Sequence, residues 1–183
     1  LILVGGGLRS AGDGVVDDFR AVVNKLNAPV INSLMGVDVL PSSKLRIGLL
    51  GSYGNRWVNM AIGMADFILV LGSRLDIRQT GADTNFFSQN RVIYHVDVDE
   101  GEVNNRITGC ETIIAHLGPF LSALNNRVQE TTHKWNAWVN TLEELKAEWP
   151  DTDELGQVEG INPNKLMHHL ARYSSQASAY SVD

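Results

Sequence analysis

The stretch "DFILVLGSRLDIRQTG" (residues 66–81) indicates how this chain folds. Its first half contains "FILVL", a run of residues typical of a buried strand, and Gly72 ends that run. A strand that is apolar at every position is buried on both faces, which is typical of a parallel sheet covered by helices. The second half places Arg74, Asp76 and Arg78 at alternate positions, so an extended segment would carry all three charges on one side.

Short apolar runs alternate with helical segments on both sides of this stretch. Strands are expected at residues 1–4, 29–32, 46–51, 66–72, 91–99 and 111–115. Helices with one apolar face are expected at residues 15–26, 55–65 and 119–127. This alternation predicts an α/β fold over about residues 1–128, with a doubly wound, Rossmann-like parallel sheet.

The region after residue 128 has a different pattern. One helical face carries Trp135, Trp138, Val139, Leu142, Leu145 and Trp149. We interpret this face as core or as a docking face in a connector helix and linker spanning residues 129–160, and Pro150 ends the helix. The segment "NPNKLMHHLARYS" predicts another helix with Pro163 in its first turn, and "SAYSVD" predicts a strand. Residues 161–183 are therefore expected to be the truncated start of a further domain.

Composition excludes several classes of function. The chain has 183 residues, of which 44% are hydrophobic and 20% charged, as in ordinary soluble domains. A net charge of -6 without any Lys/Arg run argues against a nucleic-acid partner. No apolar run reaches about 18 residues, so no membrane partner is expected. The single cysteine, Cys110, excludes an internal disulfide framework and favours a reducing, cytoplasmic location.

No catalytic or metal-binding residue is predicted. His168 and His169 are adjacent, so they do not share a face of a helix as a pair of metal ligands would. His95 lies inside an expected strand, and we interpret it as structural.

In a doubly wound sheet, ligands bind beyond the carboxyl ends of the strands. Glycine, hydroxyl or charged residues follow the clear strands of this chain. The turn formed by Gly5, Gly6 and Gly7 is consistent with a phosphate cradle or with a tight strand-to-helix turn. Ser10 replaces the third glycine of a Rossmann fingerprint, and Asn32 ends the second strand without an acidic neighbour. A standard NAD site is therefore not favoured.

Charged residues after two of the strands allow two interpretations each. Arg74 and Arg78 have planar guanidinium groups that bind phosphate or stack on rings. Asp76 between them would orient an arginine or bind a ribose hydroxyl, or all three would form an internal salt-bridge cluster. Asp97 and Asp99 follow a strand end where side chains hold ribose hydroxyls or cap a helix, and we expect one residue of the pair to do each.

Four segments together resemble the central domain of thiamine diphosphate-dependent enzymes, in the acetolactate synthase-like branch. These segments are "LVGGG", "NSLMGVDVLP", "GLLGSYGNRWVNMAIGMADFILVLGSRLDIRQTG" and "VIYHVDVDEGEVNNR". The resemblance implies a DHS-like NAD/FAD-binding fold within a larger transferase or lyase that decarboxylates a 2-oxo acid and transfers the product to an acceptor. Thiamine diphosphate and Mg²⁺ would be bound by other domains. This chain alone would be inactive, and the whole enzyme would be a homo-oligomer, a dimer or a tetramer.

The same resemblance implies that the central domain binds FAD without redox use, binds ADP, or binds nothing. The implied contacts are Gly5, Gly6, Gly7, Ser33, Leu34, Met35, Gly51, Tyr53, Gly54, Gly72, Arg74, Asp76, Arg78, Asp97 and Val98. The chain reads "GSYG" where the synthases read Gly-Met-His-Gly, and "RLDIR" where they read Arg-Phe-Asp-Asp-Arg. Two alternatives stay open: a scaffold with an empty site, and an NAD(P)-binding domain of the sirtuin or transhydrogenase type.

Overall fold

A computed structural model describes residues 1–41, 43–129 and 135–180. Its six-stranded sheet has the order β3-β2-β1-β4-β5-β6, and the paired strands are parallel. The strands are β1 (Ile2–Val4), β2 (Val30–Asn32), β3 (Arg46–Leu49), β4 (Phe67–Leu71), β5 (Val92–Asp97) and β6 (Glu111–Ile114). The predicted doubly wound α/β fold is thus confirmed. The strand order reverses between β1 and β4, which is where ligands bind in such sheets.

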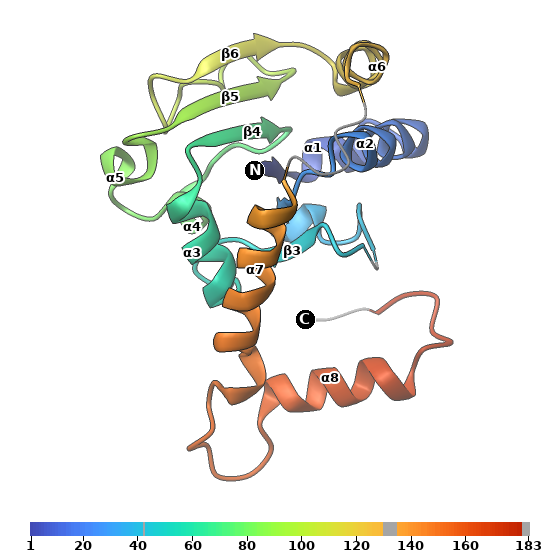
Figure 1. Ribbon diagram of the computed structural model, residues 1–183, viewed down its shortest axis with the longest axis vertical. Coiled ribbons are helices and arrows are strands. Elements are labelled where there is room, and N and C mark those ends of the chain that lie inside the picture. The colour runs from blue at the N-terminus through green and yellow to red at the C-terminus, as the bar shows by residue number, and fades with distance from the viewer. Residues whose placement is uncertain (42, 130–134, 181–183) are drawn as a thin grey trace.

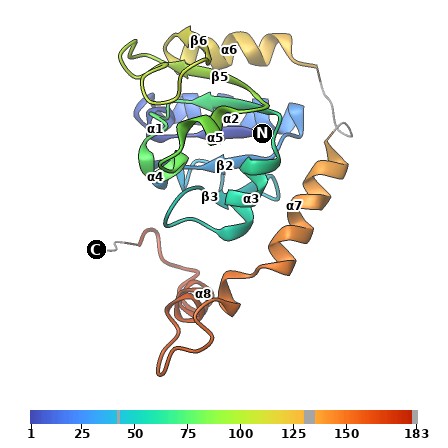
Figure 2. The ribbon, with the colours of Figure 1, turned by 90° about the vertical axis from the view of Figure 1, so that its left-hand side faces the viewer.

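Helices cover both faces of this sheet (Figures 1 and 2). One face carries α1 (Gly6–Ser10), α2 (Asp13–Leu26) and α6 (Leu117–Arg127). The other carries α3 (Arg56–Met64) and α5 (Thr84–Ser88), with the short α4 (Ile77–Thr80) after β4. The remaining elements are η1 (Leu34–Gly36), α7 (Asn136–Glu148), η2 (Asp151–Asp153) and α8 (Pro163–Tyr173).

Successive residues of one strand belong to two different cores. Ile2 and Val4 of β1 pack on the side of α2, whereas Leu3 between them packs on the side of α3. Phe19 of α2 and Val58 of α3 are fully buried in these two cores. Because both sides of the central strands are covered, both need apolar residues, and this explains the continuous apolar runs in the sequence.

The helix α7 packs onto the same domain, beside α3 (Figure 1). Leu142 is 1% exposed and belongs to the core on the α3 side, where Trp138 and Leu145 also pack. The interpretation of this apolar face as a packing face is therefore confirmed. Trp135 and Trp149, at the two ends of the face, keep more than a third of their surface exposed, at 37% and 38%.

Replacing Leu142 by Ala is expected to lower the free energy of unfolding by about 2–3 kcal/mol, because it removes buried methyl groups and leaves a cavity. Urea denaturation followed by tryptophan fluorescence would measure this. The exposed neighbour Glu144 provides the control, since Glu144→Ala should change stability by less than about 0.5 kcal/mol. Equal unfolding midpoints for the two variants would show that α7 is not part of the core.

The helix α8 lies apart from the sheet (Figures 1 and 2) and contains no buried residue. It is tied to η2, because the Asn164 side-chain amide donates to the Asp151 carbonyl at 2.9 Å. His168 Nε2 also lies 2.9 Å from a carboxylate oxygen of Asp151. The predicted helix is confirmed, with Pro163 in its first turn. In the strand expected at 178–183, residues 178–180 are irregular, and residues 181–183 lie outside the described residues.

Candidate functional site

The predicted ligand-binding residues lie at the carboxyl ends of five neighbouring strands. Residues 5–7 follow β1, residues 33–35 follow β2, and residues 51–54 come after β3. Residues 72–78 follow β4, Asp97 ends β5, and Val98 follows it. The strand order places these turns side by side along one edge, which we call the carboxyl edge. Figure 2 shows α1 and α4 on this same side of the sheet.

The glycine turn after β1 rests directly on the turn after β4. The Gly5 N–H donates to the Leu71 carbonyl and the Gly7 N–H to the Gly72 carbonyl, both at 2.9 Å. A Cβ on Gly5 would lie 2.2 Å from the Gly72 carbonyl oxygen, and one on Gly7 would lie 2.8 Å from the Gly72 Cα. Two of the three glycine N–H groups are therefore used inside the protein. The tight-turn interpretation accounts for the motif, and phosphate groups would need other donors.

Large apolar side chains stand exposed along the carboxyl edge. After β2, Leu34 is 69% exposed and Met35 is 61% exposed. After β3, Tyr53 is 84% exposed, and Val98 after β5 is 55% exposed. Apolar groups that gather at one place on a surface mark binding sites more often than scattered ones do. The turns after β2 and β3 therefore present the surface that a flat, apolar ring needs.

The segment after β4 is not extended, and this corrects the prediction that its three charges alternate along one side. Leu75 has a φ of 52°, so the chain turns there. Asp76 then caps α4, because its Oδ1 accepts a hydrogen bond of 2.7 Å from the Arg78 N–H. A left-handed residue followed by a helix N-cap has replaced the expected strand continuation.

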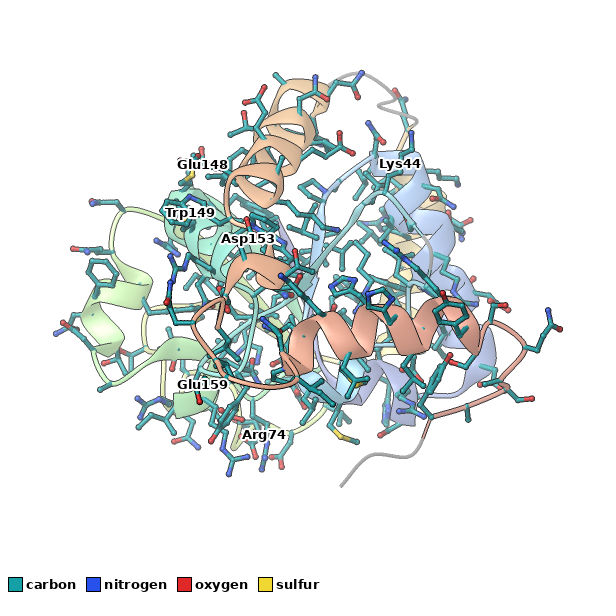
Figure 3. The ribbon with its side chains drawn as sticks, turned by 90° about the horizontal axis from the view of Figure 1, so that it is seen from below. Lys44, Arg74, Glu148, Trp149, Asp153 and Glu159 are labelled. Carbon is teal, nitrogen blue, oxygen red and sulfur yellow. The ribbon has the colours of Figure 1, made fainter. Side chains whose placement is uncertain are left out.

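Both arginine side chains of this turn reach solvent. The side chain of Arg74 is 70% exposed and lies 4.0 Å from a carboxylate oxygen of Glu102, and Figure 3 shows it at the periphery of the molecule. Arg78 is also exposed, although its carbonyl accepts from the Ser52 N–H at 2.8 Å. Within the described residues neither arginine pairs with Asp76, so the alternative of an internal salt-bridge cluster is not supported. Two such guanidinium groups suit an anionic ligand.

A recess of about 150 Å³ lies where the strand order reverses, and both Asp97 and Val98 line it. Asp97 Oδ1 accepts from the Asp99 N–H at 3.0 Å, and Asp99 Oδ1 accepts from the Gly101 N–H at 2.8 Å. Both carboxylates thus close local turns, and the helix-cap alternative is wrong, because turns rather than a helix follow β5. Pockets for whole ligands measure roughly 300–1,000 Å³, so this recess suits one part of a nucleotide.

A buried polar group that the sequence did not mark as functional lies beneath the carboxyl edge. His95 is 1% exposed, and its Nε2 lies 2.8 Å from the Ser73 carbonyl oxygen. Ser73 Oγ in turn donates to Gln79 Oε1 at 2.7 Å. Burial lowers the pKa of the His95 imidazole, while the bond to Ser73 and the charges of Asp97 and Glu102 act in the opposite direction. The signal available in the sequence was one imidazole within an apolar strand.

The lowered pKa of His95 gives stability a pH dependence. Below about pH 6.5 the unfolded chain takes up a proton that the folded His95 does not, so the free energy of unfolding falls as pH drops from there toward the lower folded pKa. Urea denaturation at about pH 7.5 and about pH 5.5 would measure the loss, and His95→Gln should show a smaller one. If the free energy of unfolding fell equally in the wild type and in His95→Gln, the pH dependence would not come from His95.

Two larger recesses lie elsewhere in the described parts of the chain, one of about 370 Å³ beside Gly51 and Arg78 and one of about 450 Å³ beside Phe67 and Trp138. No helix there is long and apolar enough to cross a membrane. No group of three or more His, Cys, Asp or Glu residues there is arranged to hold a metal ion. Cys110 is buried, and burial raises the pKa of its thiol, which lowers its reactivity.

Comparison with known proteins gives one consistent result. The family model described as thiamine pyrophosphate enzyme, central domain, matches residues 1–124. The acetolactate synthase large subunit of Lactococcus lactis subsp. lactis is 33% identical over 175 residues, which are 95% of this chain and 30% of that protein. The chloroplastic acetolactate synthase 1 of Oryza sativa subsp. japonica is 33% identical over 155 residues, which are 82% of this chain and 23% of that protein. The chain thus spans less than a third of the length of these two relatives.

Proposed function

Because the chain belongs to the family of thiamine pyrophosphate enzymes, whose central domain it matches, we propose that it binds FAD or ADP across its carboxyl edge. One observation carries this proposal: neighbouring strand ends bring exposed apolar side chains and two exposed guanidinium groups onto a single edge. A ligand with a flat, apolar ring joined to phosphate groups would complement such an edge.

The parts of the edge suit different parts of the nucleotide. Asp97, in the recess at the strand-order reversal, would accept hydrogen bonds from ribose hydroxyls. Arg74 and Arg78 would bind the phosphates, which the glycine turn alone is poorly equipped to hold. Tyr53, with Leu34 and Met35 on the adjacent turn, would contact the ring of a flavin. ADP would use the first two of these regions and leave the third uncovered.

The whole protein is proposed to be an enzyme resembling acetolactate synthase, as its relatives are named. It would decarboxylate a 2-oxo acid and transfer the product to an acceptor, and it would work as a homo-oligomer. Thiamine diphosphate, held with Mg²⁺ outside this chain, would supply that chemistry. Residues 1–128 would form the nucleotide-binding domain, residues 129–160 the connector, and residues 161–183 the start of the next domain. This chain alone would be inactive, and its single buried thiol supports a reducing, cytoplasmic location.

Titration calorimetry with FAD, ADP and NAD⁺, each added separately, tests the nucleotide assignment. We expect saturable binding of FAD or ADP and no saturable binding of NAD⁺. At about 100 times its dissociation constant, the bound nucleotide should raise the free energy of unfolding by about 2.7 kcal/mol. Saturable binding of NAD⁺ alone would favour the sirtuin or transhydrogenase type, and no binding of any of the three would favour an empty scaffold.

A further inference from the structure

We propose that His95 is a positioning residue that holds the turn after β4 in the shape that presents Arg74 and Arg78 to a ligand. This inference rests on the proposed function, because it concerns the same carboxyl edge. It goes beyond that function in assigning a role to a buried side chain that lies under the edge and does not line it.

The turn after β4 has an unfavourable backbone conformation. Gly72 and Leu75 both adopt left-handed conformations, with φ values of 57° and 52°. Glycine does so readily, but a side chain such as that of Leu75 is strained in this region. Leu75 is also 1% exposed, so the strained residue is anchored in the core. Conformations of this kind persist only where surrounding contacts enforce them.

His95 supplies one of these contacts. The sheet ladder of β4 ends where the Gly72 N–H donates to the Val96 carbonyl at 3.0 Å. Ser73, the next residue, is 3% exposed, and its carbonyl oxygen needs a donor because it has left the ladder. His95 on β5 meets that need with its Nε2 at 2.8 Å. Since a carbonyl oxygen only accepts, Nε2 carries a proton, which excludes the neutral Nδ1–H tautomer.

The second ring nitrogen supports the same assignment. Nδ1 of His95 is buried and has no hydrogen-bond partner within the described residues. A buried acceptor without a partner is unfavourable, and it is kept here because, of the two neutral tautomers, only Nε2–H can donate to Ser73. The charged groups near the ring are Asp97 and Glu102, and Arg74 pairs with Glu102 at 4.0 Å.

Hydrogen bonds link Ser73 to the segments that carry both arginines. Ser73 Oγ donates to Gln79 Oε1 at 2.7 Å, which joins the turn to α4. Arg74 directly follows Ser73, and Arg78 lies within α4. The Arg78 carbonyl also accepts from the Ser52 N–H at 2.8 Å, so the same helix orients the turn after β3. Loss of the Nε2–H donor of His95 is therefore expected to make the turns after β3 and β4 less ordered.

The first test determines the tautomer of His95 directly and needs no ligand. Nitrogen NMR of the full chain with labelled histidines should show, at neutral pH, one ring with a protonated Nε2 and a bare Nδ1. The chain has five histidines, so the spectrum of His95→Gln identifies this ring by its loss. A proton on Nδ1, or on both nitrogens, would overturn the proposal, whether or not any variant folds.

The second test measures whether the turn after β4 and α4 stay ordered. The N–H groups of Gln79 and Thr80 donate to the carbonyl of the N-cap Asp76, and that of Gly81 donates to the Ile77 carbonyl, all at 3.0 Å. Hydrogen exchange at these three amides therefore reports whether α4 stays formed. In His95→Leu, which removes the donor, we expect exchange at these amides to become about tenfold faster while amides in α2 are unchanged. His95→Gln keeps a donor near the Nε2 position and should stay closer to the wild type. Unchanged exchange in His95→Leu would overturn the proposal.

The third test connects the turn to the ligand. The dissociation constant of FAD or ADP should rise by about tenfold in His95→Leu and much less in His95→Gln. His169→Gln, on the exposed surface of α8, is the control and should bind as the wild type does. If the wild type bound neither nucleotide, the proposed function would fail, while the tautomer and exchange results would still decide the role of His95. Full affinity in folded His95→Leu would contradict that role.

Discussion

Replacing Gly5 by Ala is expected to lower the free energy of unfolding by about 3 kcal/mol or more. The new Cβ would lie 2.2 Å from the Gly72 carbonyl oxygen and 2.6 Å from the Ser73 Cα, and backbone atoms cannot rotate away as a long side chain can. The conformation of Gly5 itself is not the cause, because its φ of -111° and ψ of -173° are open to any residue. Chemical denaturation of the purified variant would measure the effect.

A second glycine provides the matched control. Gly14 lies in α2, and a Cβ there would have no neighbour within 4 Å. Because alanine is the better helix former, Gly14→Ala should be as stable as the wild type or more stable by up to about 1 kcal/mol. If Gly5→Ala matched Gly14→Ala in stability, the close approach of the β1 and β4 turns would be wrong.

Replacing Arg74 by Ala is expected to raise the dissociation constant of FAD or ADP by at least about tenfold, since a hydrogen bond to a charged group contributes about 1.5–3 kcal/mol. Calorimetric titration would measure the change. The stability of the free protein should hardly change, because the pair with Glu102 is 4.0 Å long and the Arg74 side chain is 70% exposed. Surface pairs of this kind contribute about 0–1 kcal/mol.

Two control variants distinguish the effect of the position of Arg74 on nucleotide affinity from the effect of its charge. Arg172 is an exposed cation of α8, far along the chain from the carboxyl edge, so Arg172→Ala removes the same charge without touching the site. It should leave nucleotide affinity unchanged. Arg74→Lys keeps the charge but loses the planar fork and should bind with an intermediate affinity. Unaltered affinity in Arg74→Ala would remove Arg74 from the site.

The sequence predicted the strands and the residues that follow them because these signals are local. The run "FILVL" needed only its own composition to be assigned to a strand, and β4 confirms the strand, although Phe67 at its start is 44% exposed rather than covered. The direction of a parallel sheet then placed Gly5, Tyr53 and Asp97 at one edge without further information. The docking of α7 was likewise predictable from its apolar face, although the surface that it packs on was not.

The features that could not be predicted depend on contacts between distant residues. Nothing in the sequence marks Leu75 as left-handed, since a leucine adopts that conformation only when surrounding packing enforces it. The role of His95 depends on the pairing of β4 with β5, which brings it near Ser73. The clash that keeps Gly5 a glycine arises from Gly72 on another strand. Each of these decides how the carboxyl edge is shaped.

Amide NMR during titration with FAD and with ADP would show whether a nucleotide binds along the carboxyl edge. Nucleotide binding there should produce saturable shifts that gather at residues 5–7, 33–35, 51–54, 72–78 and 97–98, with ADP affecting residues 33–35 and 51–54 least. Shifts confined to other regions, such as α8, or no saturable shifts with either nucleotide, would contradict it.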